Sequence, residues 1–254
     1  MINFTKAKEI FENYTSQFDM TNNGIKRKKE HSLRVASISR MIAEKENLDP
    51  DLGELIGLFH DIARFEQIKR FNSFSDRKTG FDHGDEGAKF IEENGWLKDI
   101  TDDRSLDSII YKSIINHNKR FIANDLSEEE LKYAKLIRDA DKIDIYYLTN
   151  VDFFHVLGVD DKTIEEIRNE KISYEAFNEV MSCHQLDLAL GTNDVNVVMT
   201  IVGFLFDINY KASIRYLEKN NYIAVLLSKI RGGVNETKLN QIEDLVYEYI
   251  RIKY

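Results

Sequence analysis

Proline and cysteine are almost missing from this sequence. Pro50 is the only proline among 254 residues, so long stretches contain nothing that would stop a helix. Cys183 is the only cysteine, which excludes an intrachain disulfide and a zinc site made of several thiolates. The sequence therefore predicts an all-α protein, and a metal site in it must use nitrogen and oxygen ligands.

Long apolar runs are missing too. No uninterrupted run reaches the roughly 18 residues of a membrane span, and residues 1–11 carry charges where a signal peptide has an apolar core. We therefore expect a cytoplasmic protein with no membrane partner. The net charge of −9 also disfavours nucleic acid, because a polyphosphate backbone needs a broad cationic surface. The expected partner is a small substrate.

Length and composition favour one folded domain with an extension. At 254 residues the chain is near the upper limit for one hydrophobic core, and it has no low-complexity tract that indicates disorder. We assign residues 1–150 to a helical core that binds metal and residues 151–254 to a helical C-terminal extension packed on that core. We interpret the extension as a cap or as a surface for homo-oligomer formation.

Apolar residues recur every three to four positions over much of the chain, which is the pattern of helices with one buried face. Ser127 and Glu130 have the spacing of a capping box at a helix start. Polar residues and glycine mark a loop between Glu66 and His83, which we interpret as an ordered loop over a site. The predicted helices are residues 26–43, 51–62, 84–93, 105–117, 127–148, 195–206 and 222–230.

Several ionisable residues fall on the apolar faces of these helices. His31 lies in one row with Val35 and Ile38, and Asp141 lies between Ile137 and Ile145. Such residues are costly to bury alone, and one bound cation would satisfy them together, since neutral imidazoles and carboxylates are metal ligands. A single histidine is more simply a hydrogen-bonded core residue, whereas the ordered set favours a metal centre. The set is His31, His60, Asp61, His83, His117 and Asp141, separated by about 20 to 35 residues.

The local strings around this set resemble the HD superfamily of metal-dependent phosphohydrolases. They are KRKKEHSLRVA, LIGLFHDIARFEQ and IRDADKID, and the resemblance, which implies an HD-domain helical bundle, spans residues 26–148. The histidines in DHGDEG and INHNKR are similar to those of binuclear members. This similarity implies that His83 and His117 bind a second metal bridged through Asp61. The first metal would be held by His31, His60, Asp61 and Asp141.

The resemblance implies a hydrolase that cleaves a phosphomonoester or phosphodiester, such as a nucleotide, by a metal-activated hydroxide. It does not support hydrolysis of cyclic di-GMP. The HD-GYP subgroup has a Gly-Tyr-Pro signature that is missing after His117, and a lysine where this chain has Arg64. Histidine and carboxylate ligands admit one or two ions of Fe, Mn, Ni, Co or Zn, and the sequence does not distinguish among them.

A phosphate substrate also needs positive groups beside the metals. The acidic chain is locally basic in residues 60–80, where we rank Arg64 and Arg77 first as substrate ligands. Lys142 is a third candidate, since it directly follows a predicted metal ligand. Solvated surface charge is the alternative for each of them, and on that ground the basic run at 26–29 is assigned no role. The catalytic candidates are Asp61 and Arg64.

Two other classes of function are open at this point. A di-iron oxygenase of the myo-inositol oxygenase type shares this fold and this type of six-residue centre, and iron-dependent consumption of oxygen distinguishes it from a hydrolase. A regulatory module that senses a nucleotide would carry a degenerate site, and the complete ligand set argues against it. The sequence does not name the substrate, since its pocket depends on loops without a readable motif.

Overall fold

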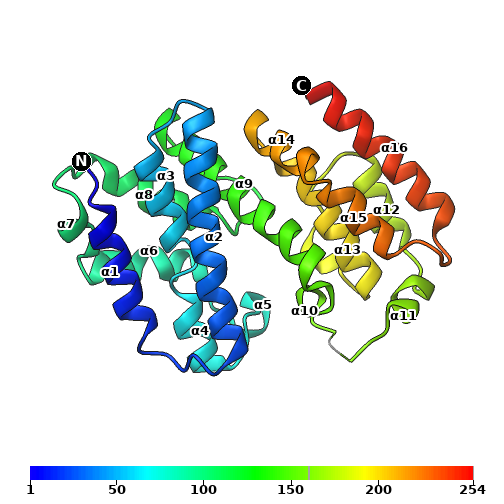
Figure 1. Cartoon of the computed structure of the whole chain (residues 1–254), viewed down its shortest axis with the longest axis horizontal. Helices are drawn as coiled ribbons and strands as arrows, with labels where there is room; N and C mark the ends of the chain where they lie inside the picture. Colours follow the sequence, from blue (N-terminus) through cyan, green and yellow to red (C-terminus); the bar gives the residue numbers. More distant parts are fainter. Residues whose placement is uncertain (160, 254) are drawn as a thin grey trace. The chain divides into compact units, whose positions relative to one another are not determined.

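A computed structural model describes residues 1–159 and 161–253 of the chain (Figure 1). Over these residues the regular structure consists of α-helices and two short 3-10 helices, with no strand. The predicted all-α class is therefore confirmed.

The chain divides into two compact units, residues 1–141 and 142–254. The division falls within helix α9 (Glu128–Val151), ahead of the predicted boundary at residue 150. All six predicted metal ligands belong to the first unit. The predicted packing of the extension on the core stays a prediction.

The helices of the first unit begin at capping residues that the sequence provides. The Asn22 side chain accepts hydrogen bonds from the backbone N–H groups of Gly24 and Ile25 at 2.9 and 3.3 Å. Asp49 caps the next helix, and Pro50 occupies its first turn, where no N–H is needed. These caps explain why two helices begin slightly before the predicted starts at 26 and 51. The unit contains α1 (Phe4–Thr15), α2 (Asn23–Lys45), α3 (Pro50–Phe59), α4 (Arg64–Phe71), α5 (Asp76–Thr79), α6 (His83–Glu93), α7 (Trp96–Ile100), α8 (Ser105–Asn116) and the start of α9.

Helices α2 and α3 lie side by side (Figure 1), and Gly57 allows their backbones to approach closely. A Cβ on Gly57 would lie 2.7 Å from Ser39 Oγ and 2.8 Å from Ala36 Cα. Gly84 has the same role between α6 and α8, since its Cβ would lie 3.0 Å from Ile114 O. The four helices joined by these contacts each carry or adjoin a predicted metal ligand, so the two glycines help to bring the ligands together.

The segment from Glu66 to His83 contains more helix than predicted. Helix α4 continues to Phe71, so the expected start of the loop at Glu66 is wrong. Glu66 pairs with Lys69 and Arg70 at 3.3 and 3.1 Å, and such pairs one turn apart stabilise an exposed helical turn without an apolar pattern. The loop proper lies between α4 and α6 and includes the single turn α5.

The second unit contains the end of α9 and the helices that follow it. Its most buried helix is α13, and the Tyr146 hydroxyl on α9 donates to Val202 O there at 3.1 Å. The predicted helices 195–206 and 222–230 correspond to α13 with η2 and to α15. Across the described parts of both units, no helix combines the length and apolar character needed to cross a membrane. The unit contains α10 (Phe153–Leu157), α11 (Ile164–Asn169), α12 (Tyr174–Met181), η1 (Leu188–Leu190), α13 (Asp194–Gly203), η2 (Phe204–Asp207), α14 (Lys211–Lys219), α15 (Tyr222–Lys229) and α16 (Glu236–Lys253).

Candidate metal centre

The structure brings the six predicted metal ligands together inside the first unit. Five of them are at most 4% exposed, and only Asp141 among the six is more open to solvent, with 19% of its side chain exposed. Four of the six stand at or next to a helix end. His31 lies on α2, His60 and Asp61 directly follow α3, His83 begins α6, His117 directly follows α8, and Asp141 lies on α9.

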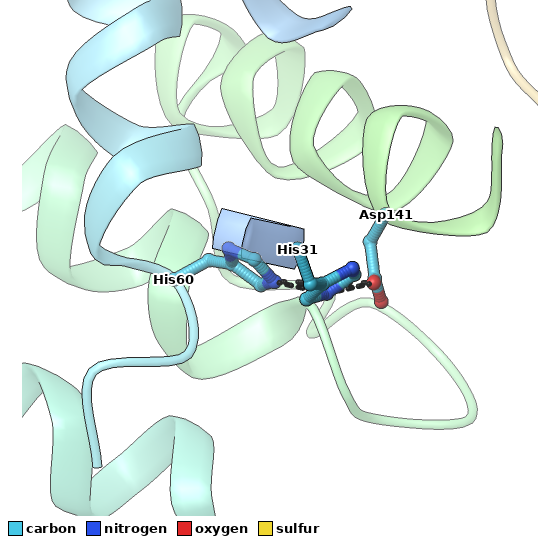
Figure 2. Close-up of side chains that lie close together, drawn as sticks. All are labelled: His31, His60 and Asp141. Atoms are coloured by element: carbon cyan, nitrogen blue, oxygen red, sulfur yellow. Dashed lines mark hydrogen bonds and ion pairs between the residues drawn. The ribbon is translucent and has the colours of Figure 1, made fainter. Parts of the chain in front are cut away.

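His31, His60 and Asp141 form the first group of ligand atoms (Figure 2). His31 Nε2 lies 3.2 Å from His60 Nε2 and also 3.2 Å from Asp141 Oδ1. His60 Nε2 lies 3.8 Å from the same carboxylate oxygen. The three atoms lie within 4.8 Å of one another, so one metal ion could contact all of them.

His83 and His117 form a second group around Asp61. Their Nε2 atoms are 3.0 Å apart, and Asp61 Oδ1 lies 3.3 Å from the first and 3.6 Å from the second. The other carboxylate oxygen, Oδ2, lies 3.5 Å from Nε2 of both His31 and His60. The two oxygens of Asp61 thus face different histidine pairs, which is how a carboxylate bridges two ions. His60, Asp61 and His117 also meet the 4.8 Å spacing, so His60 belongs to both groups that could hold an ion.

Hydrogen bonds at Nδ1 fix the orientation of three imidazole rings. Each acceptor is an oxygen, so a neutral ring keeps its proton on Nδ1 and directs the lone pair of Nε2 into the centre. Two of the rings use the backbone carbonyl three residues earlier, at the end of their own helix. The acceptors are Gly57 O for His60 at 2.8 Å, Ile114 O for His117 at 2.6 Å and Asp76 Oδ2 for His83 at 2.5 Å.

This orientation makes the centre suitable for a cation. Both His83 and His117 carry their proton on Nδ1, so the two Nε2 atoms 3.0 Å apart present facing lone pairs. Facing lone pairs repel, and a positive ion between them removes the repulsion. Imidazole nitrogen and carboxylate oxygen are ligands of divalent transition metals, so the donor set fits such an ion.

The surroundings keep these ligands in their metal-binding protonation states. Burial lowers the pKa of His60 to about 3 and the pKa of His83 to about 4, so both rings are neutral at pH 7. Burial alone would raise the pKa of Asp61, but the charge of Lys28 and the neighbouring histidines outweigh it and hold that pKa well below its usual range. Burial also opposes ionisation of Asp141, yet its hydrogen bond to a histidine lowers its pKa. The centre therefore offers the neutral imidazoles of His60 and His83 together with two carboxylates.

Lys28 contacts the centre, although no role was predicted for the basic run at 26–29 to which it belongs. Its Nζ donates to Asp61 Oδ2 at 2.6 Å, and its side chain is 25% exposed. Lys28 precedes His31 by three residues, so both side chains lie on the same face of α2. This spacing is the signal from which the contact could have been inferred.

The three predicted substrate-binding cations differ in position. Arg64 lies beside the centre, with Nε 3.6 Å from Asp61 Oδ1 and 15% of its side chain exposed. Arg77 is an exposed residue of α5. Lys142 belongs to the second unit, where its Nζ pairs with Asp207 Oδ2 at 2.8 Å. Arg64 is thus placed against a candidate ligand, whereas the roles of Arg77 and Lys142 in binding substrate stay predictions.

Asp76 is a further residue at the centre that the sequence did not reveal. It accepts the Nδ1 proton of His83 and is thus an acidic partner of a candidate ligating histidine. Burial raises the pKa of Asp76, but hydrogen bonding to His83 and the charge of Arg64 outweigh it and lower that pKa. Asp76 lies in the loop, seven residues before His83, and no helical spacing links the two.

Comparison with known protein families agrees with this geometry. Residues 29–146 match the family model of the HD domain, and the matched range contains all six predicted ligands. Residues 29–146 therefore form an HD domain. HD domains are generally metal-dependent hydrolases that bind divalent metals, so the family and the donor set of this HD domain agree. No curated protein and no solved structure matches the chain significantly.

Proposed function

We propose that this HD domain is a metal-dependent phosphohydrolase that cleaves a phosphomonoester or a phosphodiester. The observation that carries the proposal is the position of Asp61, whose two oxygens face separate histidine pairs at 3.3 to 3.6 Å. Divalent cations held in this way supply Lewis acidity and make water acidic enough to attack phosphorus near neutral pH. One cation would be held by His31, His60, Asp141 and Asp61, and the other by His83, His117 and Asp61.

Two cationic side chains flank Asp61 and suit a phosphate substrate. Lys28 Nζ lies 2.6 Å from Oδ2, and Arg64 Nε lies 3.6 Å from Oδ1. Arg64 Nε is buried and has no hydrogen-bond acceptor within residues 1–159 and 161–253, so its positive charge faces Asp61 without being used in a hydrogen bond by this atom. Cationic groups at these places orient a phosphoryl group and stabilise the charge on its non-bridging oxygens in the transition state.

Metal analysis and hydrolysis assays on the same preparation test the proposal. We expect the purified chain to bind Mn, Fe, Co, Ni or Zn and to hydrolyse at least one nucleotide monoester or cyclic nucleotide from a panel. Asp61→Ala removes the bridge, so both metal content and activity are expected to be lost. The control is Asp85→Asn, which changes an exposed carboxylate on α6. This variant is expected to keep the metal content and the activity of wild type. Equal metal content in wild type and Asp61→Ala would contradict the assignment.

The same donors would also suit a di-iron oxygenase, and the atmosphere of the assay separates the two reactions. A hydrolase cleaves its phosphoester without oxygen, whereas an oxygenase consumes oxygen when loaded with iron. The flanking Lys28 and Arg64 favour the phosphate substrate. Oxygen consumption by the iron-loaded chain, together with no cleavage of any phosphoester, would replace the hydrolase proposal.

A further inference from the structure

Both carboxylate oxygens of Asp76, the first residue of α5, accept hydrogen bonds. Oδ2 accepts from His83 Nδ1 at 2.5 Å, and Oδ1 accepts from Arg64 Nη1 at 2.7 Å and from Gln67 Nε2 at 2.9 Å. Asn118 Nδ2 also donates to Oδ2, at 3.3 Å. One carboxylate therefore joins a candidate metal ligand to α4 and to the segment that follows α8.

The loop that carries this carboxylate, residues 72–82, is attached through polar contacts and through one buried apolar side chain, that of Phe81. None of the four residues of α5 is buried, and Arg77 and Lys78 are exposed. Further polar attachments are Phe74 O, which accepts from Arg64 Nη1 at 2.5 Å, and Thr79 Oγ1, which accepts from Gln67 Nε2 at 3.2 Å. A segment with so few buried apolar groups has low local stability, so its order depends on contacts of this kind.

The loop also borders the candidate metal centre. The Phe74 ring lies 5.9 Å from Lys28 Nζ, and the same ammonium group donates to Asp61 Oδ2 at 2.6 Å. The order of the loop therefore affects the surroundings of the bridging carboxylate.

We propose that Asp76 is a positioning residue that couples cation binding at His83 and His117 to the order of the 72–82 loop. A cation on Nε2 of His83 makes its Nδ1–H a stronger donor to Asp76, and the carboxylate in turn makes Nε2 a better ligand. Because the same carboxylate holds the loop, each event favours the other by an equal free energy. The inference rests on metal binding by the proposed centre and not on the reaction that the centre catalyses.

Limited trypsin digestion of the full chain, with and without Mn²⁺, measures this coupling. Arg77 and Lys78 are exposed and lie in the loop, so cleavage after them reports its order. In wild type, saturating Mn²⁺ is expected to slow this cleavage about tenfold, a size that lies within the usual range of coupling between two sites. Mass spectrometry of the same digest also measures the rate of cleavage in the second unit. This rate corrects for any effect of Mn²⁺ on trypsin itself.

The variant Asp76→Asn removes the charge while keeping the size of the side chain. We expect it to bind one Mn²⁺ equivalent about 10- to 100-fold more weakly, as when the partner of a ligating histidine is lost. The affinity for the other equivalent should be unchanged. Its loop is expected to be cleaved equally fast with and without Mn²⁺. The matched control is Asp85→Asn, whose exposed carboxylate lies 3.0 Å from Lys119 Nζ, and it should behave as wild type.

A second variant keeps the test informative if Asp76→Asn does not fold. His83→Gln leaves Asp76 bound to Arg64 and Gln67. Cleavage without Mn²⁺ should rise because the contact from His83 to Asp76 is lost, and Mn²⁺ should give no protection.

The inference is overturned if wild type binds Mn²⁺ without protection of the loop. It is also overturned if Asp76→Asn or His83→Gln keeps full protection of the loop by Mn²⁺. Both of those results leave the proposed hydrolase standing. A wild-type chain that binds no transition metal would instead remove the proposed function and this inference together.

Discussion

Lys28 and Asp61 form an ion pair at the carboxylate that the candidate metal centre needs for bridging. The pair joins Nζ to Oδ2 at 2.6 Å, and Oδ2 is also the oxygen that faces His31 and His60. Lys28 therefore neutralises a buried carboxylate in the metal-free protein, and it competes with a metal ion for the same oxygen.

Lys28→Met is expected to separate these two effects. The metal-free variant should lose about 1–3 kcal/mol of unfolding free energy, because a buried charged acceptor loses its partner. Its affinity for Mn²⁺ should rise, because the competing ammonium group is gone. Urea unfolding in chelator and Mn²⁺ titration measure the two quantities. Lys29→Met is the control, since Lys29 pairs with Glu12 on α1 at 2.5 Å and should leave the Mn²⁺ affinity unchanged.

The buried histidines predict a pH dependence for the metal-free protein. The folded-state pKa is about 3 for His60 and about 4 for His83, below the ordinary 6.5. Between these values and 6.5, the unfolded chain therefore binds more protons than the folded chain. Stability is therefore lost as pH falls from 6.5 towards 4, by about 1.4 kcal/mol per pH unit for each ring. Urea unfolding at several pH values in chelator measures the slope. His83→Asn should reduce it, and His184→Gln, at an exposed position, should not.

Residue identities at the centre could be predicted from the sequence only in part. The predicted ligands His31 and Asp141 stand out because each interrupts an apolar face, and the local strings around the set resemble a known family. Lys28 and Asp76 did not stand out, because charged residues in a basic run or a polar loop usually face solvent. Their roles depend on which side chains the fold brings beside them.

At the scale of helices, close packing at Gly57 sets the distance between two candidate ligands. A Cβ there would meet the α2 backbone at 2.8 Å, and α2 carries His31 while His60 directly follows α3. Gly57→Ala is expected to destabilise the protein by about 1–3 kcal/mol, as other overpacked sites do, and to weaken Mn²⁺ binding. Thermal melting and Mn²⁺ titration measure the effects.

The control for this change is Gly87→Ala on α6. A Cβ at Gly87 would have its nearest neighbour, Ile114 Cγ2, at 3.5 Å, an ordinary contact. The substitution should leave metal binding unchanged and stabilise the helix by roughly 0.5–1 kcal/mol. Equal effects of the two substitutions would show that the α2–α3 approach does not position the ligands.

The predicted helices correspond to observed ones where apolar periodicity and caps coincide. The capping box at Ser127 is present, with Ser127 N donating to Glu130 Oε2 at 2.7 Å and Glu130 N donating to Ser127 Oγ at 3.3 Å. Helix α4 was not among the predicted helices, because its last turn is held by exposed ion pairs rather than by an apolar face. Close approaches at glycines were not predictable either, since they depend on the partner helix.

At the scale of the whole chain, the candidate ligands all lie in residues 1–141. Removal of metal by a chelator is expected to lower the melting temperature, since a ligand at about 1,000 times its Kd contributes about 4 kcal/mol. Hydrogen exchange should speed up at α2, α3, α6 and α8 and stay unchanged from α12 to α16. An equal change in both regions would show that the metal stabilises more than the unit that holds its ligands.

His60 and His117 are aimed by the carbonyl one turn earlier on their own helices, at Gly57 and Ile114. The orientation of each ring is thus fixed by a hydrogen bond within four consecutive residues. Such a segment could be transferred by design to the end of another α-helix whose final carbonyls are exposed. The same hydrogen bond would then orient the imidazole before a metal binds. Two such helices, crossing at their ends, would be a starting point for an artificial metalloprotein.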